Sequence, residues 1–132
     1  MENLNLILPE IFVSLSIMFL LIVGVFKKNS SKLIHNFSLI ILFISAGIVF
    51  NETLNIEKIL IFNESIIIDY LASFMKLITI LAALMALIVS SNYLKTFKIH
   101  KIEYPILIIC AVLGMMVMIS SNDLIVFYMG LE

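Results

Sequence analysis

Charged residues are scarce in this sequence. Only 13% of the 132 residues are Asp, Glu, Lys or Arg, whereas 63% are hydrophobic. A soluble domain of this size needs a charged surface to remain in solution. The composition therefore excludes an ordinary soluble domain, and the net charge of −1 gives no indication of a nucleic-acid partner.

Cysteine is almost absent as well. The single cysteine, Cys110, lies within an apolar run, which excludes a disulfide framework and leaves the redox compartment open. The sequence also lacks a CxxC pair, a glycine-rich phosphate loop and a catalytic triad. His35 and His100 fall in basic segments without a second ligand at metal-binding spacing. We therefore predict two solvated histidines, and no catalytic residue, metal site or cofactor bound by this chain.

Long apolar runs are what the sequence has in abundance. A helix of roughly 20 residues crosses a hydrocarbon core about 30 Å thick, and four runs are of about this length: residues 7–26, 33–50, 70–93 and 104–120. A fifth run, 124–132, follows Asp123, which stands where an N-cap acceptor belongs. The predicted fold class is an all-α polytopic transmembrane protein with four complete spans and a truncated fifth.

The end of the fifth run is unusual for a membrane helix. It stops at Glu132, where the last backbone carbonyls would face lipid without partners, so we expect the complete protein to continue. The start of the chain is not typical of a secretory signal, because Glu2 stands where such a signal carries Lys or Arg.

Lysines are distributed asymmetrically between the connections. Two connections are basic, and a single lysine, Lys58, lies in the acidic stretch 51–69. The basic connections carry Lys27, Lys28, Lys32, Lys95, Lys98 and Lys101. The two basic connections fall on the same side of the membrane when the spans alternate. Because cytoplasmic loops carry the excess of lysine, we place these connections inside and predict that the N-terminus is outside. Within the acidic stretch, residues 59–62 and 66–68 are apolar enough for a short hairpin around a turn at 63–65.

Glu132 is the most informative ionisable residue. It lies nine residues beyond Asp123, which at 1.5 Å per residue places it roughly 13 Å into the membrane. Ionisable groups at such depth are costly and mark proton relays or ion pathways. A carboxyl subject to both burial and a nearby cation can change its protonation state during a cycle. We predict proton transfer by Glu132; the alternatives are a glutamate buried in a polar helix contact or one that is exposed.

Lys76 and Glu10 also lie within predicted spans. Lys76 is about two turns into its span, and its long stem can carry the ammonium back to the surface. We favour this snorkelling interpretation; the alternative is an ion pair with a carboxylate on a neighbouring helix, and hence a place in a proton relay. Glu10 follows Pro9, a combination typical of the first turn of a helix, so we interpret it as a helix-start residue; a functional role is the alternative.

Small residues recur at helical spacing and predict close helix contacts. One row consists of Ala82, Ala86 and Ser90, and a smaller patch consists of Ala111 and Gly114.

Several short motifs, in order along the chain, resemble one family. They are Leu8-Pro9-Glu10-Ile11-Phe12, Phe74-Met75-Lys76, Glu103-Tyr104-Pro105, Leu113-Gly114-Met115-Met116, Ser121-Asn122-Asp123-Leu124 and Tyr128-Met129-Gly130-Leu131-Glu132. Together they are similar to the N-terminal part of the antiporter-like subunits of respiratory NADH:quinone oxidoreductase (complex I), in particular subunit N, the counterpart of mitochondrial NADH dehydrogenase subunit two.

The resemblance implies a fold and a function. Family members have about fourteen helices, including two inverted repeats with broken helices, and are thought to carry protons along a polar axis. Glu132 matches the family's glutamate on the fifth helix, whose lysine partner on the seventh helix would lie beyond residue 132. Residues 1–132 would be the N-terminal transmembrane portion of such a subunit.

The resemblance also implies the surroundings of the chain. NADH and quinone would be used by the whole complex. The partners would be its other membrane subunits and the lipid bilayer, in a bacterial inner membrane rather than a mitochondrial one. A related cation/proton antiporter, a membrane-bound hydrogenase subunit and a structural membrane module without transport remain alternatives.

Overall fold

The computed structural model describes residues 7–26, 31–55, 59–61, 65–96 and 103–132. Its helices are α2 (Leu8–Phe26), α3 (Ser31–Asn55), α4 (Tyr70–Thr96), α5 (Glu103–Ser120) and α6 (Leu124–Leu131), and its strands are β1 (Ile59–Ile61) and β2 (Ile66–Ile68). Within the described ranges, α2 to α5 are the four helices long and apolar enough to cross a membrane. The predicted class, a multi-pass helical membrane protein with a shorter fifth helix, is confirmed.

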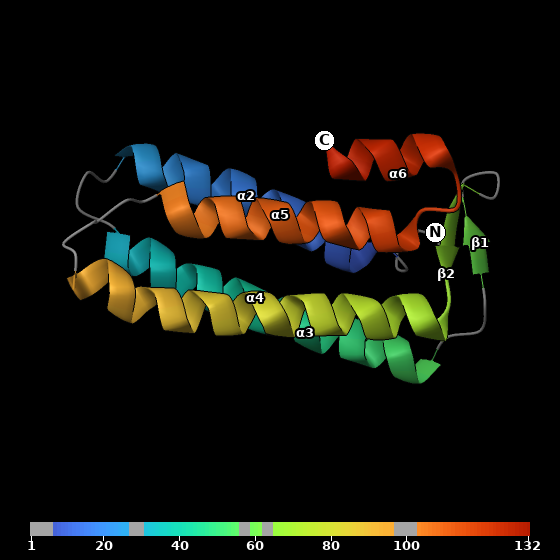
Figure 1. The fold of residues 1–132 in the computed structure, drawn as a ribbon, viewed down its shortest axis with the longest axis horizontal. Coiled ribbons are helices and arrows are strands. Elements are labelled where there is room, and N and C mark those ends of the chain that lie inside the picture. The colour runs from blue at the N-terminus through green and yellow to red at the C-terminus, as the bar shows by residue number, and fades with distance from the viewer. Residues whose placement is uncertain (1–6, 27–30, 56–58, 62–64, 97–102) are drawn as a thin grey trace.

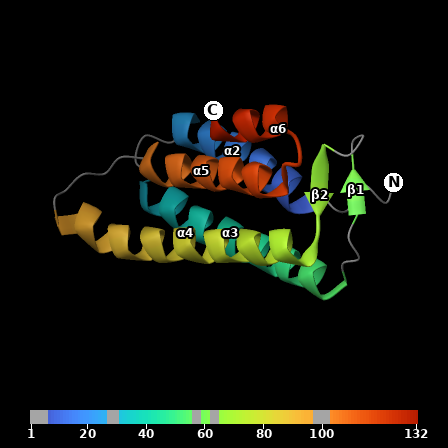
Figure 2. The ribbon, with the colours of Figure 1, turned by 45° about the vertical axis from the view of Figure 1, so that its right-hand side comes forward.

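The four long helices run alongside one another (Figure 1), and each packs mainly against two others, so that their contacts close into a ring. In this four-helix ring α2 packs on α3, α3 on α4, α4 on α5 and α5 on α2. The hairpin lies across one end, and α6 turns back along α5 on the outer side of the ring (Figures 1 and 2). Consequently α2 and α4 face each other diagonally, and side chains that join them must cross the interior.

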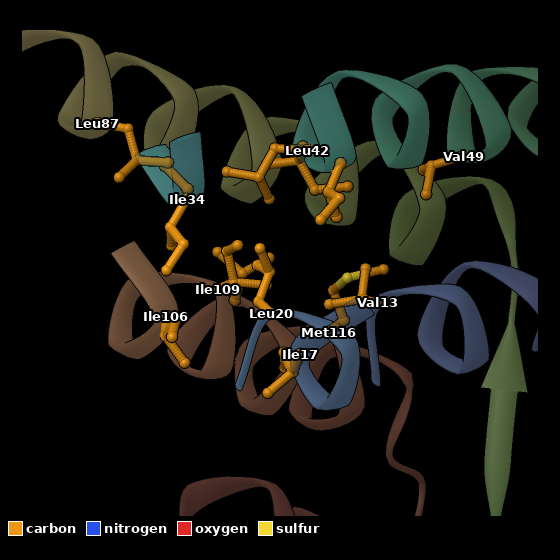
Figure 3. Packing of buried hydrophobic residues seen from close by; sticks show 14 residues of the cluster. Val13, Ile17, Leu20, Ile34, Leu42, Val49, Leu87, Ile106, Ile109 and Met116 are labelled. Carbon is orange, nitrogen blue, oxygen red and sulfur yellow. The ribbon is translucent and has the colours of Figure 1, made fainter. Parts of the chain in front are cut away.

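The interior of the ring is apolar. Figure 3 shows side chains from all four helices converging on it. The fully buried members of this core include Val13, Leu20, Ile34, Leu42, Val49, Ile80, Leu87, Ile109 and Met116. The outer faces are apolar too: Phe43 is 74% exposed and Val89 is 70% exposed. Helices that are hydrophobic all round suit a bilayer, where lipid covers the outward side chains.

Helix α3 is longer than the predicted span 33–50 at both ends. It begins at Ser31, so His35 lies within the helix and not in the connection, and it is half-buried; that its side chain is solvated stays a prediction. His100 lies outside the described residues. The helix also continues through Glu52, which the sequence analysis assigned to the acidic connection. Near this end of the helix the Thr53 hydroxyl is satisfied by the Val49 carbonyl at 2.7 Å, so this polar side chain does not require a loop.

The two strands of the predicted hairpin are confirmed. β1 and β2 pair antiparallel with Ile59 opposite Ile68 and Ile61 opposite Ile66. Residue 62 of the predicted first strand and residues 63–64 of the predicted turn lie outside the described residues. β2 also forms a bridge from Ile66 to Ser121, and the Asn122 amide donates to the Ser65 carbonyl at 2.9 Å. The hairpin thereby ties the connection between α5 and α6 to the end of the ring.

The helix ends that flank the two basic connections lie at the other end of the ring (Figure 1). Most of the lysines themselves fall outside the described residues. These helix ends lie at the same end of the ring, as spans that alternate in direction require. Which end of the ring faces the outside of the cell stays a prediction.

Candidate functional site: buried charges at one end of the bundle

Lys76 is enclosed in the interior of the ring. Its side chain is 0% exposed, and its ammonium nitrogen Nζ forms an ion pair with the Oε1 atom of Glu10. The snorkelling interpretation was therefore wrong, and the alternative, a pair with a carboxylate on another helix, is what the structure contains. The reason is geometric: α2 and α4 are diagonal, so the long lysine stem crosses the interior toward Glu10 instead of running out to the surface.

Glu10 lies in the first turn of α2, directly after Pro9, as its helix-start interpretation requires. Its side chain is 12% exposed. One carboxylate oxygen bonds to Lys76, but the other, Oε2, is buried without a hydrogen-bond partner among the described residues. Glu10 therefore does more than begin the helix, because its carboxylate is the ion-pair partner of the buried Lys76 ammonium.

Glu52 is a third ionisable group at this end of the ring, and the sequence analysis missed it. Both of its carboxylate oxygens are buried without a hydrogen-bond partner in the part of the chain that the structure describes. Its charge interacts attractively with Lys76 and repulsively with Glu10. Glu10, Glu52 and Lys76, which we call the interior charge cluster, come from α2, α3 and α4 respectively.

A signal for Glu52 exists in the sequence. Buried residues of α3 recur at alternating steps of four and three, at Ser38, Leu42, Ser45 and Val49. The next step of three reaches Glu52, on the same face of the helix. Treating residue 51 as the start of a loop hid this continuation.

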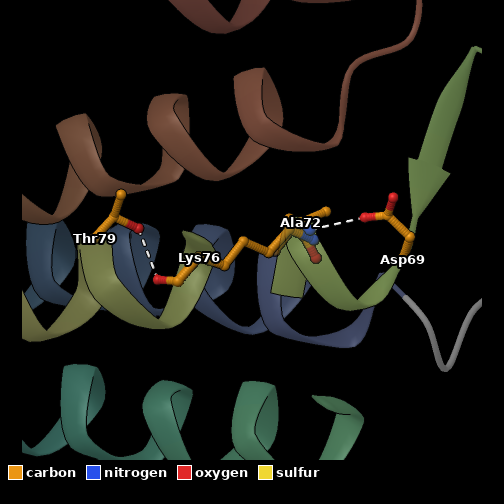
Figure 4. A network of polar contacts seen from close by, with 5 residues as sticks. Asp69, Ala72, Lys76 and Thr79 are labelled. Atoms are coloured by element: carbon orange, nitrogen blue, oxygen red, sulfur yellow. Dashed lines mark hydrogen bonds and ion pairs between the residues drawn. The ribbon is translucent and has the colours of Figure 1, made fainter. Parts of the chain in front are cut away.

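Two buried serines lie at the same end. Ser73 is 0% exposed and Ser120 is 4% exposed, and neither hydroxyl has a partner within the described ranges. Ser73 stands three residues before Lys76 and hence on the same face of α4. The backbone around it is fixed: Asp69 accepts from the Ala72 amide at 2.8 Å, and the Thr79 hydroxyl donates to the Lys76 carbonyl at 2.7 Å (Figure 4).

Glu132 lies outside the ring, and the structure does not bring it to Lys76. It is exposed at the end of α6, where it accepts a hydrogen bond from the Tyr128 hydroxyl at 3.0 Å. Its backbone amide bonds to the Tyr128 carbonyl at 3.1 Å. α6 runs back along α5 and ends part-way along the ring (Figure 1). This position agrees with the depth expected from helix geometry, whereas a role for Glu132 in proton transfer stays a prediction.

Two glycines allow α6 to approach α5. A Cβ atom on Gly114 would lie 2.7 Å from the Gly130 carbonyl oxygen, and one on Gly130 would lie 2.8 Å from Met118 Cγ. Both distances are shorter than van der Waals contact, so only glycine fits without a shift. The contact predicted at Gly114 is therefore present. The contact predicted for the row containing Ala82 and Ala86 is not formed among the described residues, where both alanines are exposed.

Asp123 occupies the N-cap position of α6 but does not cap it. Its backbone is extended, with φ −101° and ψ 147°, and its side chain makes no capping hydrogen bond. The carboxylate instead accepts a hydrogen bond from the Ser65 hydroxyl at 2.7 Å. The predicted capping contact was wrong because the hairpin, which is distant in sequence, supplies a competing donor.

Comparison with known proteins identifies relatives along the whole chain, although no family model matches it. A protein of Pelagibacter ubique named NADH-quinone oxidoreductase subunit N is 58% identical over 132 residues, which are 100% of this chain and 28% of that protein. Proteins of the same name from Paramagnetospirillum magneticum and Maricaulis maris are 41% and 39% identical; they match 96% and 99% of this chain and 26% and 27% of their own lengths. The chain therefore belongs to the family of NADH-quinone oxidoreductase subunit N, and it spans little more than a quarter of the length of these relatives.

Proposed function

We propose that this chain is part of a proton-translocating membrane subunit of NADH:quinone oxidoreductase, which couples electron transfer from NADH to quinone to proton pumping. The observation that carries the proposal is the similarity along the whole chain to proteins named as subunit N of that enzyme. The four apolar helices support it, since a subunit that moves protons must cross the membrane.

Within this proposal Glu132 is the proton-transfer residue. It is a carboxylate at the C-cap of a short apolar helix, and it is exposed rather than covered by the four-helix ring. That exposure leaves it accessible to a cationic side chain on another helix of the complete subunit. A change in that neighbouring charge would alter the affinity of the carboxyl for a proton, so coupling would be electrostatic.

The proposal also specifies the surroundings of the chain. The chain itself would bind no cofactor, and NADH and quinone would be bound elsewhere in the complex. Other membrane subunits and the lipid bilayer would be its partners, in the inner membrane of a bacterium.

The test is the substitution Glu132→Gln in the complete subunit, assembled into its complex. Proton uptake into inverted membrane vesicles is measured during NADH oxidation and is divided by the rate of oxidation. We expect proton uptake per NADH to fall, because glutamine keeps the shape of the side chain but cannot release a proton. The matched control is Glu103→Gln at the exposed start of α5, which should leave the ratio unchanged. An unchanged ratio in a normally assembled Glu132→Gln complex would overturn the role of this residue.

A further inference from the structure

We propose that the interior charge cluster is a second proton-binding site, in which Glu10 and Glu52 together hold one proton opposite Lys76. This inference goes beyond the proposed function, because it assigns a site to residues of α2, α3 and α4 and does not depend on Glu132. It rests on the geometry of three buried ionisable groups and on the hydrogen bonds that they lack.

The first step is charge balance. Two carboxylates and one ammonium carry a net charge of −1, and one added proton makes the cluster neutral. All three groups lie within apolar membrane helices, where an uncompensated charge is strongly unfavourable. Lys76 is 0% exposed and already paired with Glu10, so the uncompensated charge belongs to the pair of carboxylates. Glu10 at the start of α2 and Glu52 near the end of α3 lie at the same end of the ring. Two like charges held out of water at one end of a bundle favour the state in which only one of them is ionised.

The second step is the hydrogen-bond inventory. Five buried side-chain oxygens of the described residues lack partners: Glu10 Oε2, Glu52 Oε1, Glu52 Oε2, Ser73 Oγ and Ser120 Oγ. An ionised carboxylate only accepts hydrogen bonds, whereas a protonated one also donates. A proton on either carboxyl therefore supplies a hydrogen-bond donor at an end of the ring where several buried oxygens can accept a hydrogen bond.

The third step concerns the kind of cation. The ammonium of Lys76 already lies against Glu10 and would repel a metal ion from the same carboxylates. Among the described residues, no group of three or more His, Cys, Asp and Glu side chains is arranged to hold a metal ion. A proton needs neither a cavity nor additional ligands.

The cluster lies near one end of the four long helices rather than half-way along them. Glu10 is in the first turn of α2, Glu52 is near the end of α3, and Lys76 is in the second turn of α4. These three segments lie at the end of the ring where the hairpin is (Figure 1). In the protonation step a proton from water binds a carboxylate oxygen, and the cluster goes from a charge of −1 to neutral. The exchange occurs near one membrane surface rather than at the midplane.

Infrared spectroscopy of the purified complete complex tests the site directly. A protonated carboxylic acid has a carbonyl stretching band that an ionised carboxylate lacks. We expect the difference between the wild-type and Glu52→Gln spectra to show the loss of one such band. Glu10→Gln should cause the same loss although Glu52 is intact, because Glu52 then ionises to pair with Lys76. Glu103→Gln is the control and should leave the band in place.

Each outcome of these measurements decides whether Glu10 and Glu52 share a proton. Loss of the band in both variants supports the shared proton. A Glu52→Gln spectrum identical to the wild type would show that no proton is held, and a band that persists in Glu10→Gln would show that the two carboxyls are independent; either result would overturn the proposal. If Glu52→Gln does not assemble, Glu52→Asp replaces it, and the band should shift rather than disappear. Because the infrared readout does not involve pumping, it is independent of the outcome for Glu132.

Discussion

The two groups of ionisable residues in this chain lie in opposite environments. The interior charge cluster is enclosed by the four-helix ring, and its lysine is 0% exposed. Glu132 is exposed on α6, outside the ring, with the Tyr128 hydroxyl bonded to its carboxylate. Lys76 and Glu132 both lie in predicted apolar segments, and hydropathy alone predicts a similar cost of burying each charge. Helix packing separates them: the ring provides a partner for Lys76 on α2, whereas Glu132 is exposed outside the ring.

Replacement of Lys76 should have the most severe effect on stability. Lys76→Gln leaves the carboxylates of Glu10 and Glu52 without a cation in the interior. Breaking a buried ion pair by removing one partner costs about 3–5 kcal/mol, so we expect little assembled complex, measured by native electrophoresis of solubilised membranes. Lys32→Gln, at an exposed lysine of α3, is the control and should assemble normally. Normal assembly of Lys76→Gln would show that the ion pair does not hold the ring together.

Glu10→Gln should be milder than Lys76→Gln. Glu52 is the remaining carboxylate that interacts with Lys76, and it can take over as the charge partner. We expect the complex to assemble, with a thermal midpoint between those of the wild type and of any Lys76→Gln complex that can be isolated. A Glu10→Gln complex as poorly assembled as Lys76→Gln would contradict the idea that two carboxylates share one lysine.

Gly114→Ala should affect the Glu132 side of the molecule and leave the interior charge cluster intact. The added Cβ would meet the Gly130 carbonyl oxygen at 2.7 Å, and such overpacking typically costs about 1–3 kcal/mol. We expect a lower thermal midpoint of the complex and reduced proton uptake per NADH, because α6 carries Glu132. Gly47→Ala is the matched control, since nothing lies within 4 Å of the Cβ it would add. Equal effects of the two alanines would argue against close packing of α5 and α6.

Loss of the hydroxyl at Ser65 should have the smallest effect of the four. Ser65→Ala removes the donor to Asp123 Oδ2, an exposed hydrogen bond between the hairpin and the start of α6. A typical intramolecular hydrogen bond contributes about 0.5–1.5 kcal/mol, so we expect a small decrease in the thermal midpoint. Ser91→Ala is the control, because that hydroxyl bonds within its own helix, to the Ile88 carbonyl. If the two variants behave alike, the hairpin does not position α6 through this bond.

The positions of the elements were largely predictable. Long apolar runs predicted four membrane helices, because the thickness of the hydrocarbon core sets the length of a span. The short hairpin was also predictable, since apolar residues around a polar turn occur at 59–68. The boundary of α3 was predicted less well. A polar residue such as Glu52 was interpreted as part of a loop, whereas the helix continues and buries it.

The multi-pass membrane character of this chain, the places of its helices and the family it resembles could all be inferred from residue order alone. These conclusions depend on local quantities: the length of each apolar run, the residues at helix starts, and short motifs that include Glu132. The partners of the ionisable side chains, in contrast, depend on how the helices pack. The packing directed Lys76 inward to Glu10 and brought Glu52 to the same end. It also bonded Asp123 to Ser65 instead of to its own helix. The physical reason is that a charged side chain within apolar helices adopts the most favourable partner available in three dimensions, and residues distant in sequence supply that partner.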